Sequence, residues 1–182
     1  MLSVGVAMSL RRFLGLERAQ GTKEPGDETA SVRRIVEALD RMEPATARYL
    51  ARFAYVLGRV ARADLVVSAE ETRAMERLVM ERGSLPEAQA VVVVQIAKSQ
   101  NVLLGETDGY LVTREFAASA TSEQKRGLLD CCFAVAAADQ EISPSEEAEL
   151  RVVANELGLE HADFIAARSA HRDAVPLLKR VR

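Results

Sequence analysis

Apolar residues recur every three or four positions along most of the chain. This spacing places their side chains on one face of an α-helix. Residues 31–42 are a clear case, because Val32, Ile35, Val36 and Leu39 alternate with charged residues. The same pattern predicts helices over seven further ranges: about 44–63, 68–83, 84–100, 107–118, 121–139, 143–158 and 160–172.

Helix-start and helix-stop signals support these boundaries. Ser143 and Glu146 have the spacing of a capping box, and Pro144 stands at the first helical position, where proline is tolerated. Gly158 is expected to end the same helix in the left-handed conformation. The capping-box spacing also occurs at three other predicted starts: Ser68 with Glu71, Ser84 with Glu87, and Thr121 with Gln124.

Residues 91–96 are the one ambiguous segment, because a run of valines favours a strand on propensity alone. The helix-start signal before this run, its length and its charged flanks favour a helix that is buried over most of its girth. We therefore predict an all-α protein, folded as a compact multi-helix bundle.

The chain contains an internal repeat. Residues 53–83 match residues 128–158 after a shift of 75 positions, and the shared pattern is Ala-Asp-x-x-[Val/Ile]-Ser-x-x-Glu-x-x-x-[Met/Leu]. Each copy consists of an apolar helix, a short turn and a capped helix. Two copies predict a globule with pseudo-twofold symmetry, because a solenoid needs at least three repeats.

The second copy resembles the TerB-like, or tellurite-resistance, family. The resemblance rests on Asp139 at the end of an apolar helix, a Ser143 helix start, Glu146 seven residues after that Asp, and a closing Leu-Gly-Leu at 157–159. It extends over residues 49–173. A related module lies at the cytoplasmic end of a membrane-anchored DnaJ-like co-chaperone.

The resemblance implies a compact helical bundle with internal pseudo-twofold symmetry, in agreement with the repeat. The chain departs from the family pattern directly after each repeated Asp. Many family members have Gly there, whereas this chain has Leu65 in one copy and Gln140 in the other. The tight turn expected of the family, and any metal role attached to it, are therefore not assured.

Asp64, Glu71, Asp139 and Glu146 are the carboxylates that occupy matching positions in both copies. If the copies face each other, the four could converge, and like charges that close need a cation among them. Mg²⁺ or Ca²⁺ would suit oxygen ligands, and the resemblance implies the same, since TerB-like domains are thought to chelate divalent metal. Alternatively, each Glu serves its capping box and each Asp caps the turn that follows it.

Composition adds limits on the partners. The 182 residues are 48% hydrophobic, enough for one full core, and the net charge is −3 with charges of both signs interspersed. Nucleic acid is not an expected partner, because it would require an excess of basic residues on one face. Aromatic residues make up only 4% of the chain and there is no Trp, so stacking platforms for bases are scarce.

The N-terminal segment predicts a division of the chain. Leu10 and Phe13 stand beside two arginines, which forms a short amphipathic piece. We expect it to pack on the bundle, the alternative being weak contact with a membrane surface. Residues 19–30 contain Gly, Pro and charges without an apolar period. The predicted division is therefore an amphipathic segment over 1–18, a linker over 19–30 and a TerB-like domain over 31–182.

Cys131 and Cys132 are adjacent within a predicted apolar helix. The simpler interpretation is that both thiols are small core residues in a reduced, cytoplasmic protein. The alternative is a dithiol that captures soft metalloids, which would require exposed thiols in a positive environment.

No catalytic constellation is found. His161 and His171 are ten residues apart on one predicted helix and do not have a ligand spacing. We therefore expect a non-enzymatic domain of a stress or tellurite/metal-response system that acts through protein contacts, with a bound divalent ion as a further element. The alternative is a sequestering protein that uses the acidic residues or the two thiols. The sequence determines neither the partner nor the oligomeric state.

Overall fold

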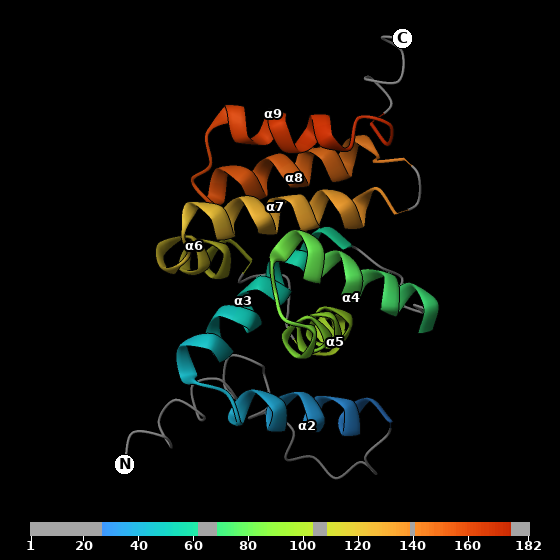
Figure 1. Ribbon diagram of the computed structural model, residues 1–182, viewed down its shortest axis with the longest axis vertical. Helices are drawn as coiled ribbons and strands as arrows, with labels where there is room; N and C mark the ends of the chain where they lie inside the picture. The colour runs from blue at the N-terminus through green and yellow to red at the C-terminus, as the bar shows by residue number, and fades with distance from the viewer. Residues whose placement is uncertain (1–26, 62–68, 104–108, 139–140, 176–182) are drawn as a thin grey trace.

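The computed structural model describes residues 27–61, 69–103, 109–138 and 141–175, and the side chains of 34–60, 72–98, 110–138 and 141–175. Over these ranges the chain is all-α, with no strand, which confirms the predicted fold class (Figure 1). The helices are α2 (Asp27–Asp40), α3 (Pro44–Ala61), α4 (Ala69–Gly83), α5 (Glu87–Leu103), α6 (Gly109–Ser119), α7 (Ser122–Ala136), α8 (Pro144–Glu156) and α9 (His161–Ala170).

Helix α3 lies at the centre of the bundle and contacts α2, α5, α6, α7 and α8. Its residues Phe53, Val56 and Leu57 are fully buried. Helices α7, α8 and α9 form one layer, and α2 lies at the opposite end against α5 (Figure 1). Among the described helices, none is long and apolar enough to cross a membrane.

The valine run is helical, as predicted. Val92, Val93, Val94 and Ile96 lie within α5 and are buried. Helix α5 packs against α2, α3 and α4, so it is enclosed on several sides. Because α5 is buried on more than one face, its sequence has no polar stripe. The packing of α5 outweighs the weak strand preference of valine.

The internal repeat is visible in the element boundaries. Helices α3 and α7 end at Ala61 and Ala136, and helices α4 and α8 begin at Ala69 and Pro144. Both pairs of positions are separated by the 75 residues of the sequence repeat. In addition, α3 packs on α7, α4 packs on α7, and α8 packs on α3. This exchange of contacts is expected for two helix pairs related by a pseudo-twofold axis.

Two of the predicted capping boxes are confirmed with full geometry. Ser143 N donates to Glu146 Oε2 at 2.7 Å, and Glu146 N donates to Ser143 Oγ at 3.3 Å. Thr121 N donates to Gln124 Oε1 at 2.8 Å, and Gln124 N donates to Thr121 Oγ1 at 3.2 Å. Gly158 has the expected positive φ of 67°.

The cap predicted at Ser84 is wrong. Ser84 has a φ of 53°, which is left-handed, whereas an N-cap residue is normally extended. It follows the last residue of α4, and the carbonyl of Pro86 accepts the first bond of α5, from Ala90 N at 3.0 Å. Three further helix boundaries differ from the sequence pattern by three residues or more: α2 begins at Asp27, four residues early, α5 continues to Leu103, and α7 ends at Ala136 instead of at 139.

Candidate functional site

The proposed metal ligands are only partly visible. Asp64 and Asp139 lie outside the described residues, and Glu71 lies in α4 with its side chain not described. Glu146 Oε2 accepts hydrogen bonds from the backbone and the hydroxyl of Ser143, both at 2.7 Å. This oxygen is committed to the helix cap, as the alternative interpretation predicts for Glu146. The described residues contain no group of three or more His, Cys, Asp or Glu side chains that could hold a metal ion.

The two thiols are core residues. Cys131 and Cys132 are fully buried, and Cys131 Sγ lies 3.9 Å from the carbonyl oxygen of Leu78. Burial raises the pKa of Cys131 to about 12, with a further contribution from the Asp130 carboxylate. Burial also raises the pKa of Cys132 well above its usual value. Because metal and metalloid capture needs the thiolate, the surroundings of both thiols disfavour that chemistry.

Asp130 connects three helices. Its Oδ2 accepts a hydrogen bond from Arg82 Nη1 at 3.0 Å, and its Oδ1 lies 2.9 Å from His171 Nε2. The hydrogen bond with His171, and then Arg82, holds the pKa of Asp130 below its usual value. The imidazole of His171 also stacks on Phe133, with centroids 5.9 Å apart and planes 10° apart. These contacts fasten the C-terminal end of α9 to α7.

The sequence did not reveal this role, because Asp130 and Phe133 are about forty residues away from His171 along the chain. His171 lies at the end of α9, and its side chain is only 10% exposed. His161, by contrast, is exposed at the start of α9.

A second polar cluster ties α3 to α6 and α8. Arg59 Nη2 lies 2.7 Å from Glu149 Oε1, and Arg59 Nη1 lies 2.6 Å from Glu156 Oε2 and 2.7 Å from Thr113 Oγ1. Burial alone would lower the pKa of Arg59, but the carboxylates of Glu156 and Glu149 more than offset it and raise that pKa. One guanidinium thus binds two carboxylates and one hydroxyl across three helices.

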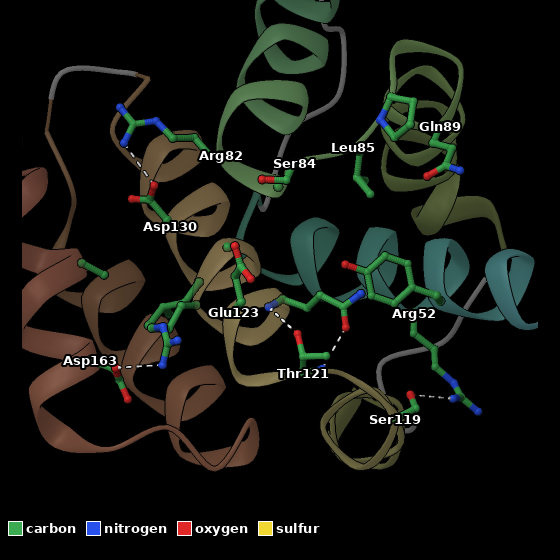
Figure 2. Close-up of a pocket in the computed structure, with 18 of the residues that line it drawn as sticks. Arg52, Arg82, Ser84, Leu85, Gln89, Ser119, Thr121, Glu123, Asp130 and Asp163 are labelled. Carbon is green, nitrogen blue, oxygen red and sulfur yellow. Dashed lines mark hydrogen bonds and ion pairs between the residues drawn. The ribbon is translucent and has the colours of Figure 1, made fainter.

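A cleft of about 1250 Å³ is bounded by α3, the α4–α5 junction, α7 and α9, and is here named the α3–α7–α9 cleft (Figure 2). Helices α3, α7 and α9 each line the cleft with residues at positions i, i+3, i+4 and i+7, which lie on one side of a helix. These residues are Ala45, Arg48, Tyr49 and Arg52 of α3; Glu123, Arg126, Gly127 and Asp130 of α7; and Asp163, Ala166, Ala167 and Ala170 of α9.

Small residues line much of the cleft. Gly83 and Gly127 lie where α4 crosses α7, and a Cβ added to Gly127 would stand 3.0 Å from the backbone oxygen of Arg82. The glycines therefore permit a close helix crossing beside the cleft. Ala166 and Ala170 leave the α9 side open, because both are exposed.

Arginines stand at the edges of the cleft. Arg126 Nη1 lies 3.7 Å from Asp163 Oδ1, and its side chain is 53% exposed. Arg82 is 42% exposed. Among the lining residues, four arginines face three carboxylates, namely Arg48, Arg52, Arg82 and Arg126 against Glu123, Asp130 and Asp163.

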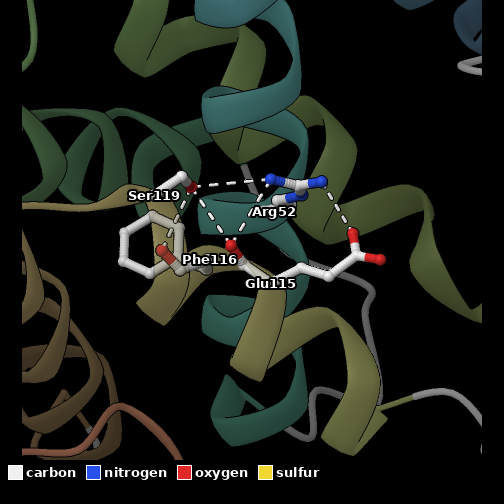
Figure 3. Close-up of polar contacts among 4 residues, drawn as sticks. All are labelled: Arg52, Glu115, Phe116 and Ser119. Atoms are coloured by element: carbon white, nitrogen blue, oxygen red, sulfur yellow. Dashed lines mark hydrogen bonds and ion pairs between the residues drawn. The ribbon is translucent and has the colours of Figure 1, made fainter.

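Arg52 marks the boundary of the cleft toward α6. Its Nη2 lies 2.7 Å from Glu115 Oε2, and its Nη1 lies 3.5 Å from Ser119 Oγ and 3.4 Å from the carbonyl oxygen of Glu115 (Figure 3). Ser119 Oγ lies 3.2 Å from the carbonyl oxygen of Phe116 and caps the end of α6. Tyr49, which also lines the cleft from α3, has its pKa raised to about 12 by burial, so its phenol is protonated at neutral pH.

The arrangement of the cleft is suited to binding. It combines exposed guanidinium groups, small side chains and polar residues such as Ser84 and Gln89 on a helical frame. The sequence did not identify this cleft, because its residues come from six helices and each set has the pattern of an ordinary polar or small helix face.

Comparison with protein families gives one match. The family model described as tellurite resistance protein TerB matches residues 49–169, well over half of the chain. The matched region begins at the position where the sequence resemblance begins, and it contains both copies of the repeat. Neither the curated proteins nor the solved structures contain a match to this chain.

Proposed function

The chain belongs to the TerB family, and on that premise we propose that it is a non-enzymatic, cytoplasmic protein-binding domain of a stress or tellurite/metal-response system. In this proposal the α3–α7–α9 cleft holds a segment of a partner protein. The observation that carries the proposal is the size and lining of that cleft. At about 1250 Å³ it exceeds the roughly 300–1,000 Å³ of typical small-molecule pockets.

Exposed small residues on α9 support a macromolecular occupant. Ala166 and Ala170 present little side chain, so a partner backbone can approach α9 closely. The opposite wall holds Arg48 and Tyr49, which are of the residue types enriched at energetically important positions of protein interfaces.

A divalent ion is the second component of the proposal. It rests on the family resemblance and on the matched positions of Asp64, Glu71, Asp139 and Glu146. Glu146 Oε2 is committed to the cap. Glu146 could therefore contribute to the metal site only through Oε1, or through Oε2 after the cap rearranges. No step of partner binding is assigned to the metal.

Two tryptophan variants on one helix test the partner site. Ala166→Trp fills the cleft from α9, whereas Ala162→Trp places the same side chain at an exposed position of α9 outside the cleft. Tagged full-length chains are used to capture partners from the native cell, and the captured proteins are quantified by mass spectrometry. We expect the first variant to lose a partner that the second retains. Equal capture by both variants would exclude the cleft as the binding site.

The metal component is tested separately. Calorimetric titration with Mg²⁺, Ca²⁺ and Zn²⁺ should give heat for the native chain and none for the variant in which the four acids become amides. That variant should lose resistance activity if the protein sequesters metal. It should change partner capture only modestly if the protein is a scaffold. Absence of binding heat in the native chain would remove the metal and leave the cleft proposal intact.

A further inference from the structure

We propose that the segment held in the α3–α7–α9 cleft is an amphipathic α-helix of a partner protein that carries carboxylates along its edges. This inference rests on the proposed function and adds the chemical class of the partner. It depends on the secondary structure around the cleft, the small residues that line it and the charges at its edges.

The secondary structure around the cleft favours a helical partner. An extended peptide usually binds by adding a strand to a sheet edge, and the described residues contain no strand. The other common mode places the apolar face of a helix in a groove between helices. Helices α3, α7 and α9 each present one continuous face to the cleft, which is the geometry that this mode requires.

The size of the lining side chains also suits a helix. A partner helix with its side chains is about 10–12 Å across, so it fits only where the groove walls are short. Gly127, Ala166 and Ala170 provide such walls on the α7 and α9 sides. Leu85 and Leu129 belong to the core beneath the cleft, since they are only 9% and 1% exposed, so the exposed alanines supply the accessible apolar surface.

The charges at the edges favour carboxylates on the partner. Arg48, Arg82 and Arg126 present exposed guanidinium groups to the cleft. Arg52 is already paired with Glu115 at 2.7 Å, so Arg48 is the arginine of α3 that can contact an acidic residue of the partner.

The arginines on the other walls have donors to spare. A guanidinium has five N–H donors, and Arg82 gives one of them, from Nη1, to Asp130. Arg126 stands 3.7 Å from Asp163, too far for a short hydrogen bond. Both guanidinium groups can therefore bind a further carboxylate in the bidentate manner that arginine favours.

The acids in the cleft argue against a nucleic acid as the occupant. On α7, Glu123 and Asp130 stand on either side of Arg126, and Asp163 lines the cleft from α9. A phosphate backbone carries charge at every nucleotide and would be repelled at each of these carboxylates. A helix can instead place single carboxylates opposite the arginines and neutral residues opposite the acids.

The test uses a display library of helical peptides with randomised surface positions, selected against the full-length chain. We expect the enriched peptides to combine an apolar stripe with Asp or Glu at helical spacing. Their affinity should fall at least about tenfold for Arg48→Glu/Arg126→Glu, which corresponds to about 1.4 kcal/mol. Arg73→Glu/Arg77→Glu, at exposed positions of α4 outside the cleft, should leave the affinity unchanged.

Peptides of reversed charge serve as a control for misfolding of the Arg48→Glu/Arg126→Glu variant. Peptides with Lys in place of the enriched acids should bind Arg48→Glu/Arg126→Glu more tightly than they bind the native chain. The inference is overturned if the enriched peptides show no excess of acid, if none is enriched, or if binding is indifferent to the cleft arginines. It is also overturned if a random RNA pool binds with the same dependence on Arg48 and Arg126. If any of these results occurs while Ala166→Trp still abolishes partner capture from the native cell, the proposed function stands. Only the proposal of a partner helix with carboxylates is then rejected.

Discussion

Asp130 receives a hydrogen bond from Arg82 and another from His171, on two different helices. Its pKa is lowered in the folded state, so its ionised form stabilises the fold. For a lowered carboxyl pKa, the stabilisation is present above the unfolded pKa of about 3.9 and disappears as pH falls through the lower folded value. The contribution of Asp130 therefore belongs to neutral and mildly acidic pH.

We expect Asp130→Asn to reduce the free energy of unfolding by about 1–3 kcal/mol at pH 7, the cost of weakening hydrogen bonds to a charged group. The difference from the native chain should shrink as pH falls below about 4, because the native chain then also loses the negative charge of Asp130. Urea unfolding across pH measures it. Glu81→Gln, at an exposed site on α4, serves as the control and should stay within about 0.5 kcal/mol. A constant difference down to pH 2 would contradict the role given to the charge.

The two cysteines allow a second prediction at this scale. Because both are fully buried and their pKa values are raised, neither should react with a thiol reagent in the folded protein at pH 7. Two equivalents should react once the chain is unfolded in denaturant. Rapid labelling of the native protein, or tellurite-dependent protection from labelling, would revive the metalloid interpretation.

Glu146 shows how far single residues could be interpreted from the sequence. Its capping role followed from the Ser-Pro-x-Glu spacing, because capping is a local interaction within four residues. Its metal role required knowledge of what lies opposite, which spacing does not contain. The same limit applies to His171, whose partners Asp130 and Phe133 are about forty residues away in the chain.

At the scale of elements, the Arg59 cluster is the strongest tie between α3 and α8. Glu149 and Glu156 are both largely buried, with side chains 24% and 10% exposed. Removing the guanidinium would leave two carboxylates without their cation. Such a loss is costly even where the intact ion pair contributes little net stability.

We expect Arg59→Met to destabilise the protein by about 3–5 kcal/mol. Arg59→Met/Glu149→Gln/Glu156→Gln should recover part of this loss, because the buried charges are removed together. Thermal and urea unfolding measure both variants, with Arg77→Met on the exposed face of α4 as the matched arginine substitution. If the triple variant is less stable than the single one, charge is not the reason for the loss.

The sequence predicted elements well where the signal was local. The starts of α7 and α8 follow from their capping boxes, and the valine run was assigned to a helix from its length and flanks. The prediction at Ser84 was wrong, because the Ser-x-Pro-Glu pattern resembles a helix start whereas Ser84 is left-handed, directly after Gly83, which packs closely against Phe53. This contact belongs to tertiary packing, which the local pattern does not record.

At the scale of the whole molecule, the repeat organises the fold. Matching helix ends 75 residues apart and the exchanged contacts of α4 and α8 agree with the pseudo-twofold plan that the sequence predicted. The plan does not extend to the cleft. Helix α9 follows the second copy and forms one wall of the cleft, so the cleft is asymmetric and could not be derived from the repeat.

The family match covers both copies of the repeat and most of α9, and it establishes the family. The proposal that the α3–α7–α9 cleft binds a partner rests on the lining of the cleft in this chain.

The central claim is that the α3–α7–α9 cleft is the partner-binding face, and site-specific photocross-linking in the native cell tests it most directly. A photoreactive residue replaces one exposed alanine at a time, either Ala45 or Ala170 in the cleft, or Ala118 or Ala148 outside it. The account predicts one cross-linked partner, shared by both cleft positions and absent from both outside positions. Cross-links from Ala118 or Ala148, with none from Ala45 or Ala170, would contradict it.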